Sequence, residues 1–199
     1  MQATGTALSR FAKQVSNVFI PPTWSVLMFW SVSIKLGHSL WQILVWGSIG
    51  TFFTAVLPIL YVGWLEKRGK VTHKHIPLRS QRNGPYLLSL LLWLFTFLLL
   101  YITKAPDFLL AAVLASIGNT LFIFIVNLFW KISAHMLGTA GPLIILSFSF
   151  GWWAAPLYIF LLLIGWSRIL LKAHTPAQAV WGGISGLVLT YVQMAFYLK

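Results

Sequence analysis

Long apolar runs alternate with short polar breaks along most of the chain. A helix that crosses a bilayer needs about 20 mostly apolar residues. The apolar runs therefore predict seven spans, at about 18–37, 40–64, 86–103, 107–130, 133–150, 152–170 and 175–197. Polar turns, Gly151 and Pro176 mark breaks between them. The pattern predicts an all-α fold, a polytopic membrane helical bundle of about 6–7 transmembrane helices.

Two segments fall outside this pattern. Residues 66–85 form the one long polar loop. In residues 1–17, Leu8, Phe11 and Val15 recur at helical spacing beside Arg10 and Lys13, which predicts a short interfacial helix. No soluble domain is evident, so residues 1–199 are expected to form a single integral membrane domain.

Composition agrees with a membrane protein. Residues are 59% hydrophobic and 8% charged, whereas a soluble domain carries roughly 25% charged residues. The net charge of +12 would suggest nucleic acid in a soluble protein, but here the charges flank apolar runs, which favours a role in topology or a contact with anionic headgroups. The chain has no cysteine, and Glu66 and Asp107 are its only acids, which argues against thiolate chemistry, two-carboxylate hydrolysis and carboxylate-bound metals.

The basic residues are distributed unequally between the two sides of the membrane. With seven spans, eleven Lys and Arg residues fall on the side of the N-terminus, and Lys35, Lys104 and Lys199 fall on the other. The positive-inside rule makes the basic side cytoplasmic. We expect an integral protein of a bacterial inner membrane in this orientation.

Polar residues gather in three clusters, at 73–82, 131–135 and 167–178. The chain returns to the same side after every second span, so the span count places all three clusters on one face of the membrane. Polar groups at a membrane are costly and mark functional sites. Three clusters on one face therefore predict a shared site.

These residues suit the chemistry of a phosphate ester. Arginines bind phosphate through forked donors. Two histidines can divide the roles of nucleophile and general acid, and a serine with the N–H groups of a helix start can complete an anion cradle. No cofactor or metal is needed. The residues favour hydrolysis of a phosphomonoester at the membrane surface.

The motifs resemble those of the phosphatidic acid phosphatase type 2 superfamily, the membrane-bound lipid phosphate phosphatases. The third motif of that family, S-R-x5-H-x3-D, is similar to Ser167-Arg168, five residues, His174, three residues and Gln178. The second, P-S-G-H, is similar to 132–135, which includes Ser133, Ala134 and His135. The first, K-x6-R-P, is matched loosely by His75, six residues and Arg82. The residues of all three motifs resemble those of a bacterial branch of this superfamily with variant motifs.

The resemblance implies a fold with the core of that superfamily and a role for each residue. His174 would attack phosphorus and form a phosphohistidine, and His135 would protonate the leaving alkoxide and then activate water. Gln178 would orient His174. The phosphate oxygens would bind to Arg82, Arg168, Ser133 and Ala134, with His75 in the place of the family's lysine and Arg79 as a further cation. The substrate would be phosphatidate, phosphatidylglycerol phosphate or a polyprenyl phosphate or diphosphate, making the protein a phosphoric monoester hydrolase.

Two departures keep another function open. Gln178 brings no charge where the family has aspartate, and His75 replaces a lysine. The alternative is a catalytically weak or inactive member that serves as a structural subunit of a larger membrane complex, or as a homo-oligomer. Arg82 could instead be a topological anchor, and Arg168 a snorkelling side chain. Gly182 and Gly186 have the spacing of close helix packing.

Overall fold

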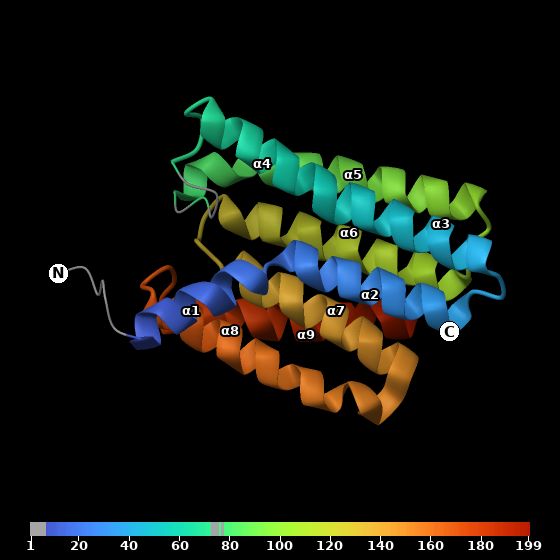
Figure 1. The fold of residues 1–199 in the computed structure, drawn as a ribbon. Helices are drawn as coiled ribbons and strands as arrows, with labels where there is room; N and C mark the ends of the chain where they lie inside the picture. Colours follow the sequence, from blue (N-terminus) through green and yellow to red (C-terminus); the bar gives the residue numbers. More distant parts are fainter. Residues whose placement is uncertain (1–6, 73–75, 77) are drawn as a thin grey trace.

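The structure is a computed structural model that describes residues 7–72, 76 and 78–199. Its regular structure is helical, at 85% of the residues, with no strand in the described part (Figure 1). The elements are α1 (Ala7–Val18), α2 (Pro21–Leu36), α3 (Leu40–Thr51), η1 (Phe52–Val56), α4 (Leu57–Lys67), η2 (Arg79–Arg82), α5 (Asn83–Ile102), α6 (Asp107–Asn127), α7 (Ala134–Phe150), η3 (Gly151–Leu157), α8 (Tyr158–Leu170) and α9 (Pro176–Tyr197). The predicted all-α membrane bundle is confirmed.

The number of spans differs from the prediction. Within the described residues, five helices are long and apolar enough to cross a membrane: Leu40–Lys67, Arg79–Ile102, Asp107–Asn127, Ala134–Leu170 and Pro176–Tyr197. The first predicted span is missing from this set because α2 has 16 residues, about 24 Å of helix against a hydrocarbon core of about 30 Å. The fourth contains two predicted spans, 133–150 and 152–170, because the chain turns back at Gly151, where φ is 63°, and α7 and α8 run in opposite directions on either side of this predicted break (Figure 1).

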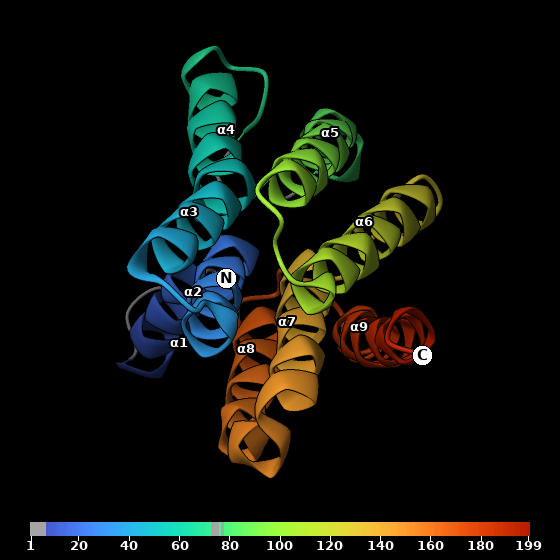
Figure 2. The same cartoon turned by 90° about the vertical axis from the view of Figure 1, so that its right-hand side faces the viewer.

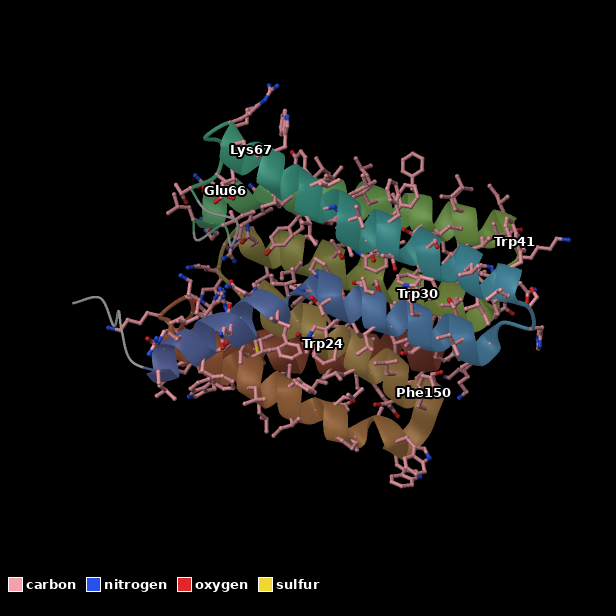
Figure 3. All side chains as sticks on the ribbon, viewed as in Figure 1. Trp24, Trp30, Trp41, Glu66, Lys67 and Phe150 are labelled. Carbon is pink, nitrogen blue, oxygen red and sulfur yellow. The ribbon has the colours of Figure 1, made fainter. Side chains whose placement is uncertain are left out.

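The described residues of the three polar clusters lie at one end of the bundle. The helix α2 and the α7–η3–α8 hairpin run along the bundle beside the longer helices (Figure 1). Figure 3 shows Glu66 and Lys67 at the end where α4 stops, and Trp41 and Phe150 at the opposite end. The ends of α4, α6 and α8 and the starts of α5, α7 and α9 therefore meet at one end, which we call the polar end.

The helix α1 lies at the polar end and packs against α8 (Figure 1). Its buried face consists of Ala12, Val15 and Ser16. Beside that face, Leu8, Phe11 and Val18 are about half exposed. An amphipathic helix with apolar side chains left outside the protein suits the membrane interface, as predicted for residues 1–17. Residues 1–6 of that prediction lie outside the described part.

Close packing of α7 and α9 fixes the centre of the polar end. A Cβ on Gly182 would lie 2.7 Å from the carbonyl oxygen of Ser133, and a Cβ on Gly186 would lie 2.7 Å from the Cβ of Ala140. Larger residues at either position would push the helices apart, so the predicted close packing is confirmed. This contact holds the start of α7 against the start of α9.

A bend in the long helix Leu40–Lys67 opens a space at the polar end. The helix α2 packs against α3, where Trp30 Nε1 donates a hydrogen bond to Thr51 Oγ1 at 2.9 Å. The π-helical segment η1 follows, and Pro58 adds a residue without a backbone N–H. Both features bend helices. Beyond the bend, α4 runs away from α2 (Figures 1 and 2).

Candidate functional site

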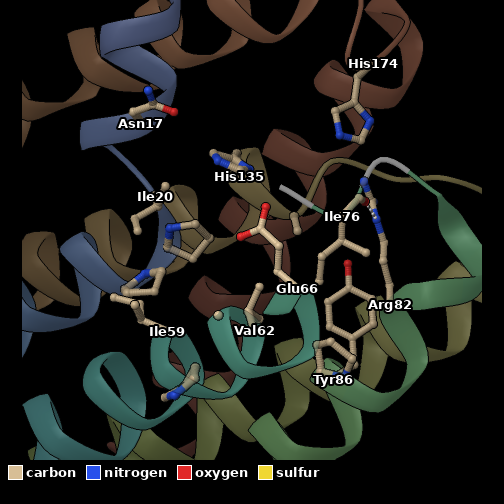
Figure 4. A pocket seen from close by; sticks show the side chains of 16 residues that line it. Asn17, Ile20, Ile59, Val62, Glu66, Ile76, Arg82, Tyr86, His135 and His174 are labelled. Atoms are coloured by element: carbon tan, nitrogen blue, oxygen red, sulfur yellow. Dashed lines mark hydrogen bonds between the residues drawn. The ribbon is translucent and has the colours of Figure 1, made fainter. Parts of the chain in front are cut away.

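A cavity of about 420 Å³ lies at the polar end, between the α1–α2 junction and α4 (Figure 4). Its lining residues come from α1, α2, α4, α5, α7, and the loops that carry Ile76 and His174. Four residues of the predicted site line it: Arg82, Ala134, His135 and His174. Segments as far apart in the sequence as Asn17 and His174 thus contribute to one cavity.

Arg82 enters this cavity from the start of α5. Its side chain is 6% exposed. The guanidinium Nε donates to the carbonyl of Ile76 at 2.9 Å, one terminal nitrogen donates to the carbonyl of Ile132 at 3.4 Å, and Tyr86 is a further side-chain partner. These partners are neutral. A buried guanidinium with neutral hydrogen-bond partners favours an anion in its cavity, where the Glu66 carboxylate or a bound ligand can supply it.

His174 lies in the short loop between α8 and α9. Its side chain is 5% exposed, and its backbone N–H donates to the carbonyl of Arg168 at 3.2 Å. The same carbonyl accepts the N–H of Ala173, whose own carbonyl accepts Lys131 Nζ at 3.0 Å. These bonds fix the loop, and therefore the imidazole, against the end of α8.

The imidazole of His174 is strongly biased toward its neutral form. Its pKa is lowered from 6.5 to about 3, mainly because the ring is buried and also because three cations lie nearby. In order of effect these are Arg82, Arg168 and Lys131, while the Gln178 side chain acts in the opposite direction. Burial and the same two arginines lower the pKa of Lys131. A neutral imidazole has the free electron pair that a nucleophile requires.

This shift predicts a specific pH dependence. The folded-state pKa lies below the unfolded value near 6.5, so protonation favours the unfolded chain, and this destabilisation grows as pH falls from about 6.5 to about 3. Imidazole ¹⁵N NMR on histidine-labelled protein in nanodiscs should show His174 still neutral at pH 5. Arg82→Gln should raise its pKa. Titration of His174 near 6.5 in the unaltered protein would contradict this account.

Arg168 is near His174 but is held by α1. The side chain is 4% exposed, and one terminal nitrogen donates to Ser16 Oγ at 2.5 Å. Its Nε is buried without a hydrogen-bond partner among the described residues. Arg168 does not belong to the lining of the 420 Å³ cavity. It contributes positive charge beside the cavity, and the interfacial helix sets its orientation.

The contact with Ser16 is expected to stabilise α1 on the bundle. Ser16→Ala removes a hydrogen bond to a buried charge, so the free energy of unfolding should fall by about 1–3 kcal/mol. SDS titration in mixed micelles measures this change. Gln14→Ala, on the exposed side of the same helix, is the control and should have little effect. Equal stability of the Ser16→Ala and unaltered proteins would show that the bond contributes nothing.

The second motif forms the start of α7. Ser133 is fully buried, its Oγ accepts the N–H of Met136 at 3.4 Å, and its own N–H donates to the carbonyl of Gln178 at 3.2 Å. It therefore caps the helix and joins α7 to α9. Ala134 and His135 follow in the first turn and line the cavity. The third-motif residue Ser167 is also fully buried, and its Oγ donates to the carbonyl of Ile164 at 2.9 Å.

Gln178 caps α9 and lies beside His174. Its Oε1 accepts the backbone N–H of Thr175 at 3.1 Å, and its own N–H donates to Thr175 Oγ1 at 3.3 Å, which completes a capping box at the start of α9. The Gln178 side chain also interacts with the imidazole of His174 and raises its pKa, against the larger lowering effects. The Nδ1 of His174 is buried without a hydrogen-bond partner within the described chain, so the orienting role of Gln178 stays a prediction.

A further predicted residue, Arg79, does not line the cavity. Arg79 donates to the carbonyls of Asn127, at 2.9 Å, and Leu128. It thus caps the C-terminal end of α6, where a cation is favourable, and is absent from the lining. His75 lies outside the described residues, so its predicted role stays a prediction.

Sequence reasoning missed Glu66 as a residue of the site. It is one of only two acids and lines the cavity from the end of α4. Figure 4 shows its carboxylate directed into the cavity on the side of His135. The sequence feature that could have identified Glu66 is its position at the end of a predicted span, just before the first polar cluster. Across the described residues, no group of three or more His, Asp and Glu side chains could hold a metal ion.

Because comparisons with known proteins identified no related protein, the assignment of a function depends on the residues of the site. A scan against protein-family models, a search of curated proteins and a search of solved structures each found no match.

Proposed function

We propose that the protein is a metal-independent lipid phosphate phosphatase. The observation that carries this proposal is the pair of buried arginines, Arg82 and Arg168, whose side-chain partners are neutral and which lie beside two histidines. Buried guanidinium groups with neutral partners favour an anionic ligand, and a forked guanidinium matches phosphate oxygens. The histidines supply the groups for phosphoryl transfer.

The cavity also favours a substrate with a lipid part. Apolar side chains of Ile20, Ile59 and Val62 line it opposite the cations. A headgroup can therefore bind at the polar end while its hydrocarbon remains in an apolar setting. Phosphatidate, phosphatidylglycerol phosphate and polyprenyl phosphates or diphosphates have this chemistry, and the motif resemblance to lipid phosphate phosphatases supports the same class.

In the proposed reaction, His174 is the nucleophile and His135 the proton carrier. A neutral nitrogen of His174 forms a bond to phosphorus while the phosphorus–oxygen ester bond breaks, and His135 gives its proton to the leaving alkoxide. Water then attacks the phosphohistidine, His135 accepts the proton of the water, and the phosphorus–nitrogen bond breaks. Inorganic phosphate and His174 are released. Arg82 and Arg168 stabilise the negative charge that develops on the phosphoryl oxygens.

The proposed orientation places the polar end in the cytoplasm of a bacterium. Basic residues of α1, α4, η2 and α8 gather there, while Lys35, Lys104 and Lys199 follow or end helices that finish at the opposite end. Lys70 is exposed, so Lys70→Cys tests this placement. If the introduced thiol reacts only with a reagent added outside intact cells, the cytoplasmic placement is contradicted.

A structural subunit is the second candidate. The capping role of Gln178 favours it, because His174 then lacks the charged partner that the family's aspartate would provide. The deciding experiment offers lipid phosphates, without added metal, to purified protein in detergent. Release of phosphate supports the phosphatase. No release from any substrate, together with stable co-purification of other membrane subunits, would reject it.

A further inference from the structure

A second cavity continues inward from the first. Its volume is about 230 Å³, and both cavities are lined by Pro21, Pro22, Pro58, Pro85, Tyr86 and Ala134. These shared residues form a waist between the two spaces. We call the second space the inner cavity. Any group that passes the waist moves away from Arg82, His135 and His174, none of which lines the inner cavity.

The inner cavity extends toward the middle of the bundle. Its wall includes Trp93 on α5 and Ser116 on α6. Since α6 ends at Asn127 at the polar end, and a helix rises 1.5 Å per residue, Ser116 lies about 16 Å from that end. This depth corresponds to the hydrocarbon layer of a membrane rather than to its headgroups.

Five hydroxyl groups in the wall are satisfied within their own helices. Each donates to the carbonyl four residues earlier, which leaves no hydroxyl proton for a ligand or water. The donors are Ser25 at 3.4 Å, Thr54 at 2.7 Å, Ser89 at 2.8 Å, Ser116 at 2.8 Å and Thr120 at 2.7 Å. The inner cavity is therefore less polar than its residue types suggest.

The one amide in the wall is satisfied by α9. Asn119 Nδ2 donates to Thr190 Oγ1 at 2.6 Å, and Asn119 Oδ1 accepts Gln193 Nε2 at 3.2 Å. Both polar atoms of the Asn119 side chain are therefore hydrogen-bonded to α9, no residue of which lines the inner cavity. Water enters a cavity when polar groups there need partners, and an apolar cavity takes up hydrocarbon instead.

The size of the inner cavity suits one hydrocarbon chain. An apolar protein cavity of about 150 Å³ binds benzene, so 230 Å³ accommodates on the order of nine carbon atoms. We propose that the inner cavity binds one hydrocarbon chain attached to the phosphate, so that the substrate class is lipid phosphates with a long hydrocarbon chain. This inference rests on the proposed function for the position of the phosphate, and it places the second chain of a two-chain lipid outside the cavity.

A thiol-protection experiment tests occupancy without requiring hydrolysis. The chain has no cysteine, so Ser116→Cys in nanodiscs carries a single thiol in the wall. Dodecyl phosphate should slow its reaction with a small thiol reagent by at least about fivefold. Butyl phosphate at the same concentration should protect far less, because its chain is too short to fill the inner cavity. Ser48→Cys, at an exposed position of α3, should be unaffected by any of them.

Equal reaction of the Ser116→Cys thiol with and without dodecyl phosphate would overturn the inference. Equal protection by butyl phosphate would overturn the assignment of the inner cavity to a long chain. If the unaltered protein releases no phosphate while protection is seen, the proposed hydrolysis fails and the chain site stands.

Filling the inner cavity tests the same inference through selectivity. Ser116→Leu should lower the ratio of kcat/KM for dodecyl phosphate to that for butyl phosphate at least about tenfold, because the added carbons exclude the chain. Ser89→Leu fills the same space from α5, and it replaces Ser116→Leu in this test if Ser116→Leu does not fold. Ser48→Leu is the matched control. An unchanged ratio in a folded cavity variant would contradict a chain site.

Discussion

Replacement of His174 by alanine is expected to abolish phosphate release from a lipid phosphate. The loss should be at least about 10⁴-fold in kcat, since removal of a nucleophile from a catalytic unit costs this much or more. Binding should survive, because Arg82 and Arg168 remain. The measurement is phosphate release beside the Kd of a non-hydrolysable alkyl phosphonate.

The matched control is His38→Ala. His38 is exposed near the start of α3, at the end opposite the cavity, and lines neither cavity. It should release phosphate at the rate of the unaltered protein. Retention of turnover by His174→Ala would remove this residue from the reaction and would require another nucleophile.

Replacement of Arg82 by methionine should produce the second-largest loss. Methionine fills much of the same space but removes the guanidinium from the cavity, so kcat/KM should fall by about 10²–10³, the usual cost of losing one charge-stabilising donor in an active site. Arg82→Lys should be intermediate, because it keeps the charge and loses the forked geometry. Phosphate release at several substrate concentrations measures all three proteins.

Arg79→Met is the informative control for Arg82. The two arginines are three residues apart, but Arg79 caps α6 and does not line the cavity. Its replacement should lower stability and leave kcat/KM within about threefold, as expected for a change outside an active site. A larger loss of kcat/KM in Arg79→Met than in Arg82→Met would contradict the assignment of the phosphate site.

Hydrophobic patterning was sufficient for the fold class and for the common end of the three polar clusters. Runs near 20 apolar residues leave few alternatives to membrane helices, and the alternation of their ends brings Arg82, His135 and His174 together. The span count was less accurate because apolar length does not fix helix length, and α2, with 16 residues, is shorter than its apolar run. The predicted break at Gly151 is the point where the chain turns back between α7 and α8.

The roles of individual polar side chains were less predictable. Gln178 has the motif position of an orienting residue and the sequence position of a helix cap, and the structure uses it as the cap. Arg79 and Arg82 look alike in the sequence and begin and end the same 3₁₀ turn, yet Arg79 caps α6 while Arg82 enters the cavity. Glu66 and Ser16 reach the site only through tertiary packing of α4 and α1, which no local spacing encodes.

The most direct measurement of the central claim is the search for a phosphoryl group on His174. His135→Gln protein, in which breakdown of the intermediate should be slow, would be mixed with ³²P-labelled lipid phosphate, quenched in alkali and digested. The account predicts alkali-stable, acid-labile label on the peptide that contains His174, and none in the His174→Ala variant. Phosphate release by the unaltered protein with label on another residue, or no label and no release from any lipid phosphate, would contradict it.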